Sequence, residues 1–173
     1  MPDCRLRVTD WVEGVLDAWL AFEVANDFCR APRNPKKLAR LKAVYYGLMA
    51  AVAHHLGRLF ATLRQEGVWD DTLIVFTSDH GEMMGDHWML GKSGYFDQAF
   101  AVPLIVRDPT ARAKGGRIDA FSEAVDVMPT LLTHLGLPVP PQCDGRALQP
   151  FLEGTVPTNW RDAAHWEFDF RDV

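Results

Sequence analysis

Residues 72–77, Thr72-Leu73-Ile74-Val75-Phe76-Thr77, form a short apolar run in which polar residues do not alternate. A run of this kind predicts a strand that is buried on both faces, as in the centre of a parallel sheet. A second apolar run, over residues 102–106, predicts another strand. Pro103 is tolerated there because it lies close to the start of the run.

A long amphipathic helix is predicted before the first strand. Apolar side chains recur every three or four residues from Leu38 to Leu63, which is the spacing of one helix face. Gly67 follows at the place where a left-handed C-cap is expected. We therefore predict a helix from about Pro35 to Glu66.

A shorter helix is predicted over residues 127–135. Asp126 stands at its N-cap position and Pro129 in its first turn, where the missing N–H costs little. Gly136 ends the helix. The order of helix, strand, loop, strand and helix predicts an α/β layered fold with a mainly parallel sheet.

The chain before this pattern is harder to interpret. The apolar spacing in residues 8–28 predicts an amphipathic helix, and two prolines interrupt the chain in residues 31–35. We divide the chain into an N-terminal helical segment of uncertain role, residues 1–35, and a main segment, residues 36–173.

Composition limits the class of protein. The chain has 173 residues, of which 48% are hydrophobic and 24% charged, as in an ordinary globular domain and unlike a disordered chain, a collagen or a coiled coil. The net charge of −5 and the absence of a basic run argue against nucleic acid or an anionic membrane as partner. No apolar stretch reaches the roughly 18 residues of a membrane span. No signal peptide is visible, and three irregularly spaced cysteines suit neither a disulfide framework nor a zinc site. We predict a cytoplasmic protein.

The candidate chemistry lies directly after the first strand. Asp79 and His80 offer a carboxylate and an imidazole, which suit Mn²⁺, Ca²⁺, Zn²⁺ or Fe²⁺. They can share one ion only if the chain turns there, and Gly81 is the residue expected to permit that turn. Two ligands are too few for a divalent ion, so the remainder must come from elsewhere in the fold. The alternative is a simple turn in which Asp79 caps backbone N–H groups.

Lys92 is the second candidate residue. A lysine beside a metal site can hold an anionic oxygen of a sulfate-like or phosphate-like group and stabilise its charge. The alternative is a solvated loop lysine. His54 and His55, on the long helix, are interpreted as surface or interface residues.

These motifs, taken in order, resemble the sulfatases of the alkaline phosphatase superfamily. The segments 77–82, 85–87 and 91–92 resemble the second metal-binding segment of that family. The subgroup that the chain resembles most is the phosphonate monoester hydrolases. Further matching segments are residues 45–49, 102–106, 126–132 and 144–150, and for the subgroup residues 97–100 and 165–173.

The resemblance implies an alkaline phosphatase-like layered α/β fold, present here as a partial domain, the C-terminal half of a sulfatase-type catalytic domain. It implies a hydrolase of small sulfate, phosphate or phosphonate monoesters with one divalent metal ion. Asp79 and His80 are then metal ligands. Lys92 is a catalytic residue that binds the substrate's sulfuryl or phosphoryl oxygens.

The chain departs from the family in one respect that matters for catalysis. The family's nucleophile is a formylglycine made from the cysteine of a Cys-x-Pro-x-Arg motif, and this chain has no such motif. Cys29-Arg30-Ala31-Pro32-Arg33 places its proline one position late and lies too close to the metal segment. The acidic ligands that relatives carry early in their chains have no counterpart either. A truncated non-catalytic fragment or an interaction module is therefore the alternative, and we expect the isolated chain to be inactive and to associate, which leaves a homo-oligomer open.

Overall fold

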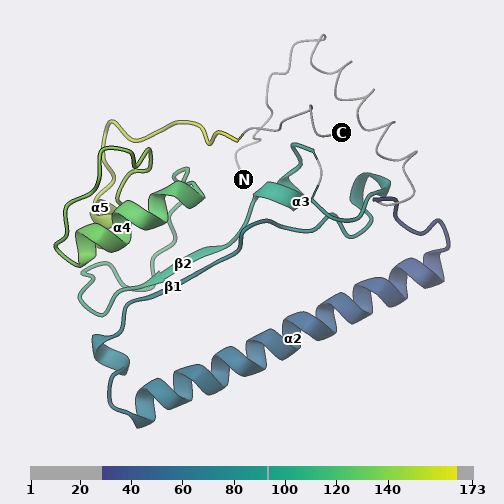
Figure 1. Cartoon of the computed structure of the whole chain (residues 1–173), viewed down its shortest axis with the longest axis horizontal. Helices are drawn as coiled ribbons and strands as arrows, with labels where there is room; N and C mark the ends of the chain where they lie inside the picture. Colours follow the sequence, from purple (N-terminus) through teal and green to yellow (C-terminus); the bar gives the residue numbers. More distant parts are fainter. Residues whose placement is uncertain (1–28, 93, 167–173) are drawn as a thin grey trace. The chain divides into compact units, whose positions relative to one another are not determined.

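A computed structural model describes residues 29–92 and 94–166 (Figure 1). The helix predicted within residues 8–28 lies outside the described residues. The described elements are α2 (Pro35–Gln65), η1 (Trp69–Asp71), β1 (Ile74–Thr77), η2 (Asp86–Trp88), α3 (Asp97–Phe100), β2 (Leu104–Arg107), η3 (Ala124–Asp126), α4 (Val127–His134) and α5 (Gln149–Leu152).

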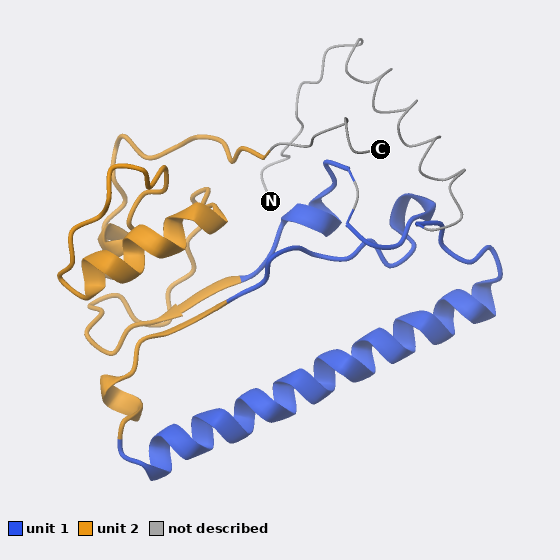
Figure 2. Cartoon of the chain, viewed as in Figure 1, with its two compact units in different colours: residues 1–67, 77–103 blue, residues 68–76, 104–173 orange. Residues whose placement is uncertain are grey.

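The chain divides into two compact units, coloured separately in Figure 2. Unit 1 comprises residues 1–67 and 77–103, and unit 2 comprises residues 68–76 and 104–173. Unit 1 holds α2 and the loop after β1 with all three predicted site residues. Unit 2 holds β2, α4 and α5.

The long helix begins and ends where the sequence predicts. The side chain of Asn34 accepts hydrogen bonds from the N–H groups of Lys36 (2.9 Å) and Lys37 (3.4 Å), which satisfies two of the free donors of the first turn. Gly67 has a φ of 70°, and its N–H donates to the Arg64 carbonyl at 3.1 Å. Local capping residues thus fix both ends of α2.

The apolar face of α2 is only partly covered. No residue of the helix is fully buried, although Leu38, Leu41 and Tyr45 are half-buried. Several large apolar side chains on it are more than half exposed: Val44, Tyr46, Leu48, Met49, Val52 and Leu59. Packing of an apolar face usually supplies most of a helix's stability, and here much of that face is exposed.

The described strands make a two-stranded sheet, β1 beside β2. Both predicted strands are present. β1 begins two residues later than the predicted run 72–77, and β2 covers 104–107 where 102–106 is predicted. The prediction that the 72–77 run is buried on both faces is wrong for this structure, since Ile74, Val75 and Phe76 are half-buried and Thr77 is exposed. Burial on both faces requires a layer of structure on each face.

In unit 2, one arginine ties the end of β2 to η1. The guanidinium of Arg107 donates to the carbonyls of Trp69 (2.7 Å) and Thr72 (3.0 Å). It also lies 4.0 Å from the centroid of the Trp69 ring. Because a guanidinium can donate in its plane and stack on its face at once, a single side chain makes both contacts.

The predicted helix over residues 127–135 is confirmed as α4, Val127–His134, with Gly136 beyond it at a φ of 67°. Asp126 occupies the N-cap position, but its side chain does not cap α4. Its carboxylate instead accepts the N–H of Glu123 at 2.8 Å, within the reciprocal cap of η3. The prediction of the N-cap position is confirmed and the role of its side chain differs.

Among the described helices, none combines the length and the apolar character that crossing a membrane requires.

Candidate functional site

The predicted metal ligands lie in a bend just beyond β1. The backbone N–H of His80 donates to Asp79 Oδ1 at 3.0 Å, and the Ser78 hydroxyl donates to the His80 carbonyl at 2.8 Å. These bonds curl the chain, so that Asp79 and His80 do not point to opposite sides as they would in a strand. His80 Nε2 lies 3.4 Å from Asp79 Oδ2.

Hydrogen bonds to the backbone orient both side chains. The hydrogen bond from the His80 N–H lowers the pKa of Asp79 below its ordinary value, which favours the charged carboxylate. His80 Nδ1 lies 2.8 Å from the Gly81 carbonyl. A carbonyl can only accept, so a proton on Nδ1 satisfies this contact. In the tautomer without a proton on Nε2, that nitrogen could bind a metal ion.

The 3.4 Å between His80 Nε2 and Asp79 Oδ2 suits either an ion pair or two ligands of one cation. Ligand atoms about 2.0–2.1 Å from a tetrahedral zinc ion are separated by roughly 3.4 Å. Ligands about 2.4 Å from calcium at right angles are separated by a similar distance, so the separation does not select the metal. Asp79 is open to solvent, with its side chain 83% exposed. The pair fits part of a divalent-metal site.

The pair is incomplete as a metal centre. Within residues 29–92 and 94–166, no group of three or more His, Cys, Asp or Glu side chains gathers to hold an ion. The expectation that the remaining ligands come from elsewhere in the fold stays a prediction.

Gly81 is required for a different reason from the one predicted. Its φ does not fall in the left-handed region. Instead its N–H donates to the Ala99 carbonyl at 2.7 Å, and a Cβ at this position would lie 1.9 Å from the Gln98 carbonyl oxygen. A close approach of two backbones, not a turn, excludes any larger residue here.

Glu82, the second carboxylate of the motif, binds backbone and is not a partner of the Asp79–His80 pair. Its Oε1 accepts the N–H of Gly91 at 2.6 Å and that of Met84 at 3.3 Å. The N–H of Met83 donates to the Gly91 carbonyl at 2.8 Å. Both ends of the loop 82–91 are thus joined.

The loop itself is wound tightly around two buried methionines, Met83 and Met89, each with no exposed surface. Three residues other than glycine within it have positive φ: Met84, His87 and Trp88. The His87 ring stacks on Phe96, with ring centroids 3.9 Å apart. Backbone in this conformation is costly and persists only where surrounding contacts hold it.

Lys92 directly follows this loop and is exposed. Exposure suits either a solvated lysine or one that meets an anionic ligand, so its role stays a prediction. His54 and His55 are exposed on α2.

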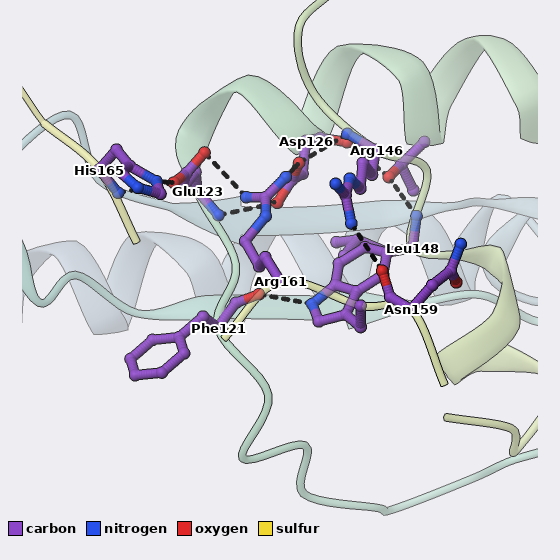
Figure 3. A network of polar contacts seen from close by, with 10 residues as sticks. Phe121, Glu123, Asp126, Arg146, Leu148, Asn159, Arg161 and His165 are labelled. Carbon is purple, nitrogen blue, oxygen red and sulfur yellow. Dashed lines mark hydrogen bonds and ion pairs between the residues drawn. The ribbon is translucent and has the colours of Figure 1, made fainter. Parts of the chain in front are cut away.

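Sequence reasoning missed a polar network in unit 2, shown in Figure 3. Asp126 is completely buried. Its carboxylate accepts hydrogen bonds from the guanidinium of Arg161 at 2.7 and 2.8 Å and from the N–H of Arg146 at 2.7 Å. Arg161 also contacts Glu123 at 2.8 Å. The partners lie 20 and 35 residues away in sequence, so no local pattern indicates them.

A second set of bonds from the same motif holds the chain after residue 144. The Thr130 hydroxyl donates to the Asp126 carbonyl at 2.6 Å and accepts the N–H of Leu148 at 2.9 Å. The Gly145 backbone passes so close that a Cβ there would lie 2.0 Å from the Val125 carbonyl oxygen. The segments 126–132 and 144–150, quoted above for their resemblance, therefore support structure in unit 2.

The comparisons with known proteins identify the family of the chain. The family model described as Sulfatase matches residues 18–137. The chain belongs to the sulfatase family. The match begins within residues 1–35, for which the sequence alone offered no resemblance.

The similar proteins of this sulfatase-family chain include both sulfatases and phosphonate hydrolases. PehA from Trinickia caryophylli, a multifunctional alkaline phosphatase superfamily protein, is 50% identical over 138 residues, covering 79% of this chain and 27% of PehA. An arylsulfatase from Clostridium perfringens is 36% identical over 140 residues, covering 79% of this chain and 29% of the arylsulfatase.

A solved structure shows the same fold. The phosphonate monoester hydrolase of Agrobacterium radiobacter aligns with a TM-score of 0.74 at 56% identity, covering 79% of this chain and 27% of that one. The chain thus has the alkaline phosphatase-like α/β fold as a partial domain, and it spans about a quarter of the length of these relatives.

Proposed function

We propose that this chain supplies part of the active site of a hydrolase of sulfate, phosphate or phosphonate monoesters. The observation that carries the proposal is the Asp79–His80 pair, in which His80 Nε2 lies 3.4 Å from Asp79 Oδ2 and His80 Nδ1 lies 2.8 Å from the Gly81 carbonyl. Membership of the sulfatase family and the similarity to PehA and to a phosphonate monoester hydrolase support this class of substrate.

In the proposed site, Asp79 and His80 hold one divalent ion. Such an ion supplies Lewis-acid polarisation of an ester oxygen. The bond from the His80 N–H lowers the pKa of Asp79, and the Gly81 carbonyl would accept a proton carried on Nδ1 of His80. The Lys92 ammonium binds the anionic oxygens of the ester and stabilises the charge that grows on them. The nucleophile is not supplied by a Cys-x-Pro-x-Arg motif of this chain.

The proposal predicts that the chain binds a substrate analogue in a metal-dependent way. Phenylphosphonate with added Mn²⁺ gives a ³¹P resonance that broadens when the ion and the phosphorus share a site. We expect broadening with the natural sequence, loss with Asp79→Ala/His80→Ala, and reduction with Lys92→Ala. Equal broadening in all three proteins contradicts the proposal.

The second candidate is a non-catalytic fragment or interaction module. Two observations favour it: the absence of a third metal ligand in the described residues and the exposed apolar side chains of α2. Hydrolysis of an aryl sulfate, an aryl phosphate and an aryl phosphonate separates the candidates. Turnover lost in Asp79→Ala/His80→Ala shows a working site. Binding of the analogue without turnover shows a site that needs a nucleophile from elsewhere. If the chain shows neither binding nor turnover, the second candidate is supported.

A further inference from the structure

Lys92 directly follows a glycine in the left-handed conformation. Gly91 has a φ of 81°. A Cβ at Gly91 would meet nothing within 4 Å, so close packing does not require a glycine there. A glycine has more backbone conformations available than any other residue. Contacts that restrict Gly91 therefore restrict the direction in which the chain enters Lys92.

Glu82 makes one such contact. Its Oε1 lies 2.6 Å from the Gly91 nitrogen, the short distance typical of a bond to an ionised acceptor. The Met83 N–H holds the other side of the same residue through the Gly91 carbonyl at 2.8 Å. Gly91 is thus held at both its N–H and its carbonyl, directly before Lys92.

The position of Glu82 in the chain gives the bond its consequence. Glu82 follows His80 by two residues, and Gly81 between them is pressed against the backbone at Gln98 and Ala99. The carboxylate is therefore anchored to the bend that carries the metal-ligand pair. Leu41, Tyr45 and Leu48 of α2, with Glu82, border an open groove of about 440 Å³. Apolar surroundings of this kind strengthen a hydrogen bond to a charged acceptor.

We infer that Glu82 is a positioning residue, whose carboxylate fixes Lys92 relative to the bend that holds Asp79 and His80. This inference rests on the proposed function, since Lys92 needs a fixed position only if it binds the same ligand as the metal pair. The experiment that tests it needs no metal ion.

Spin labels measure the placement directly. We would label Thr77→Cys, at the exposed end of β1, and Lys92→Cys, with the three native cysteines replaced by serine and the labelled protein diluted in unlabelled chain. Dipolar electron paramagnetic resonance then gives the distribution of distances between the two labels. We expect a narrow distribution with Glu82 and a clearly broader one with Glu82→Ala.

Two further variants distinguish positioning from general folding. Glu82→Gln keeps an acceptor at the same place and is expected to restore the narrow distribution, whereas Glu82→Asp keeps the charge but is one methylene too short to reach Gly91. Asp86→Ala, which removes an exposed carboxylate of the same loop, is the matched control and should change nothing. If Glu82→Ala does not fold, the label distributions of Glu82→Asp and Glu82→Gln are compared instead, and a broader distribution in Glu82→Asp supports the inference while equal widths contradict it.

Amide exchange provides the second readout. The Gly91 N–H should exchange about 10- to 100-fold faster in Glu82→Ala, as expected for the loss of one bond to a charged acceptor. A narrow label distribution and an unchanged Gly91 amide in Glu82→Ala would overturn the inference. Broadening in a chain that binds no phenylphosphonate would leave the role of Glu82 intact and refute the proposed function instead.

Discussion

Replacing Arg161 by methionine should destabilise unit 2 far more than the removal of an exposed arginine. Arg161 is 10% exposed and donates two hydrogen bonds to Asp126, which has no exposed surface. Methionine keeps much of the volume of the arginine side chain, so the substitution tests mainly the charge. It also removes the guanidinium carbon that lies 5.4 Å from the centroid of the Trp160 ring.

The magnitude follows from what the substitution leaves behind. Breaking a buried ion pair by removing one partner costs roughly 3–5 kcal/mol, because the other charge stays buried and uncompensated. Asp126 keeps two backbone donors, the N–H groups of Glu123 and Arg146. We therefore expect the lower end of that range, about 3 kcal/mol. Arg161→Lys should lose less stability than Arg161→Met, because lysine keeps the positive charge, although it cannot form the bidentate contact with the Asp126 carboxylate.

Urea unfolding followed by tryptophan fluorescence measures the loss. The matched control is Arg117→Met, which breaks an ion pair with Asp119 in which both side chains are more than 70% exposed. It should cost less than about 1 kcal/mol. Adding Asp126→Asn to Arg161→Met removes the uncompensated charge, so the double variant should lose less than the sum of the single losses. Equal losses for Arg161→Met and Arg117→Met would refute the reasoning.

Two further predictions concern unit 2 and α2. Gly145→Ala should destabilise the protein because its Cβ would lie 2.0 Å from the Val125 carbonyl oxygen. Gly57→Ala, in open space within α2, should stabilise the protein by about 0.5–1 kcal/mol. Thermal unfolding compares the two variants, and a Gly145→Ala protein as stable as the natural one would contradict the close approach at Gly145. Burial raises the pKa of Asp108, but the hydroxyl and N–H of Thr110 and the charge of His134 outweigh it, so that the net pKa lies below the ordinary 3.8. A carboxyl with a lowered pKa in the folded state stabilises the protein at pH values above its pKa in the unfolded chain, and this stability is lost as the pH falls through the folded-state pKa. Asp108→Asn should therefore flatten the decline of the unfolding free energy at pH values below about 5. Urea unfolding at several pH values measures that decline, and an unchanged decline in the variant would contradict the prediction.

The parts of the fold that the sequence predicts are those that local chemistry decides. The bounds of α2 follow from Asn34, Pro35 and Gly67, all within a few residues of the helix ends. Gly136 marks the end of α4 in the same way, whereas the side chain of Asp126 makes no cap hydrogen bond at its start. Capping acts over one turn, so it can be read directly from the order of residues.

The parts that it does not predict depend on partners distant in the chain. Asp126 looks like a helix cap in the sequence, and only the fold brings Arg161 to it from 35 residues away. Glu82 follows the two candidate ligands in the sequence, and only the closed loop shows that it binds the Gly91 N–H, nine residues further along the chain. Burial of the 72–77 run depends on neighbouring layers, which the run itself does not specify.

The most direct test of the Asp79–His80 metal pair is a titration of the chain with Mn²⁺, in which electron paramagnetic resonance measures the free ion. The control is Asp97→Ala, which removes an exposed carboxylate at the start of α3. If Asp79 and His80 form the metal pair of a sulfatase-type site, the natural chain and Asp97→Ala bind the ion alike, and both Asp79→Ala and His80→Ala bind it more weakly. If Asp79→Ala and His80→Ala bind Mn²⁺ as the natural chain does, the pair is an ordinary turn and the account is wrong.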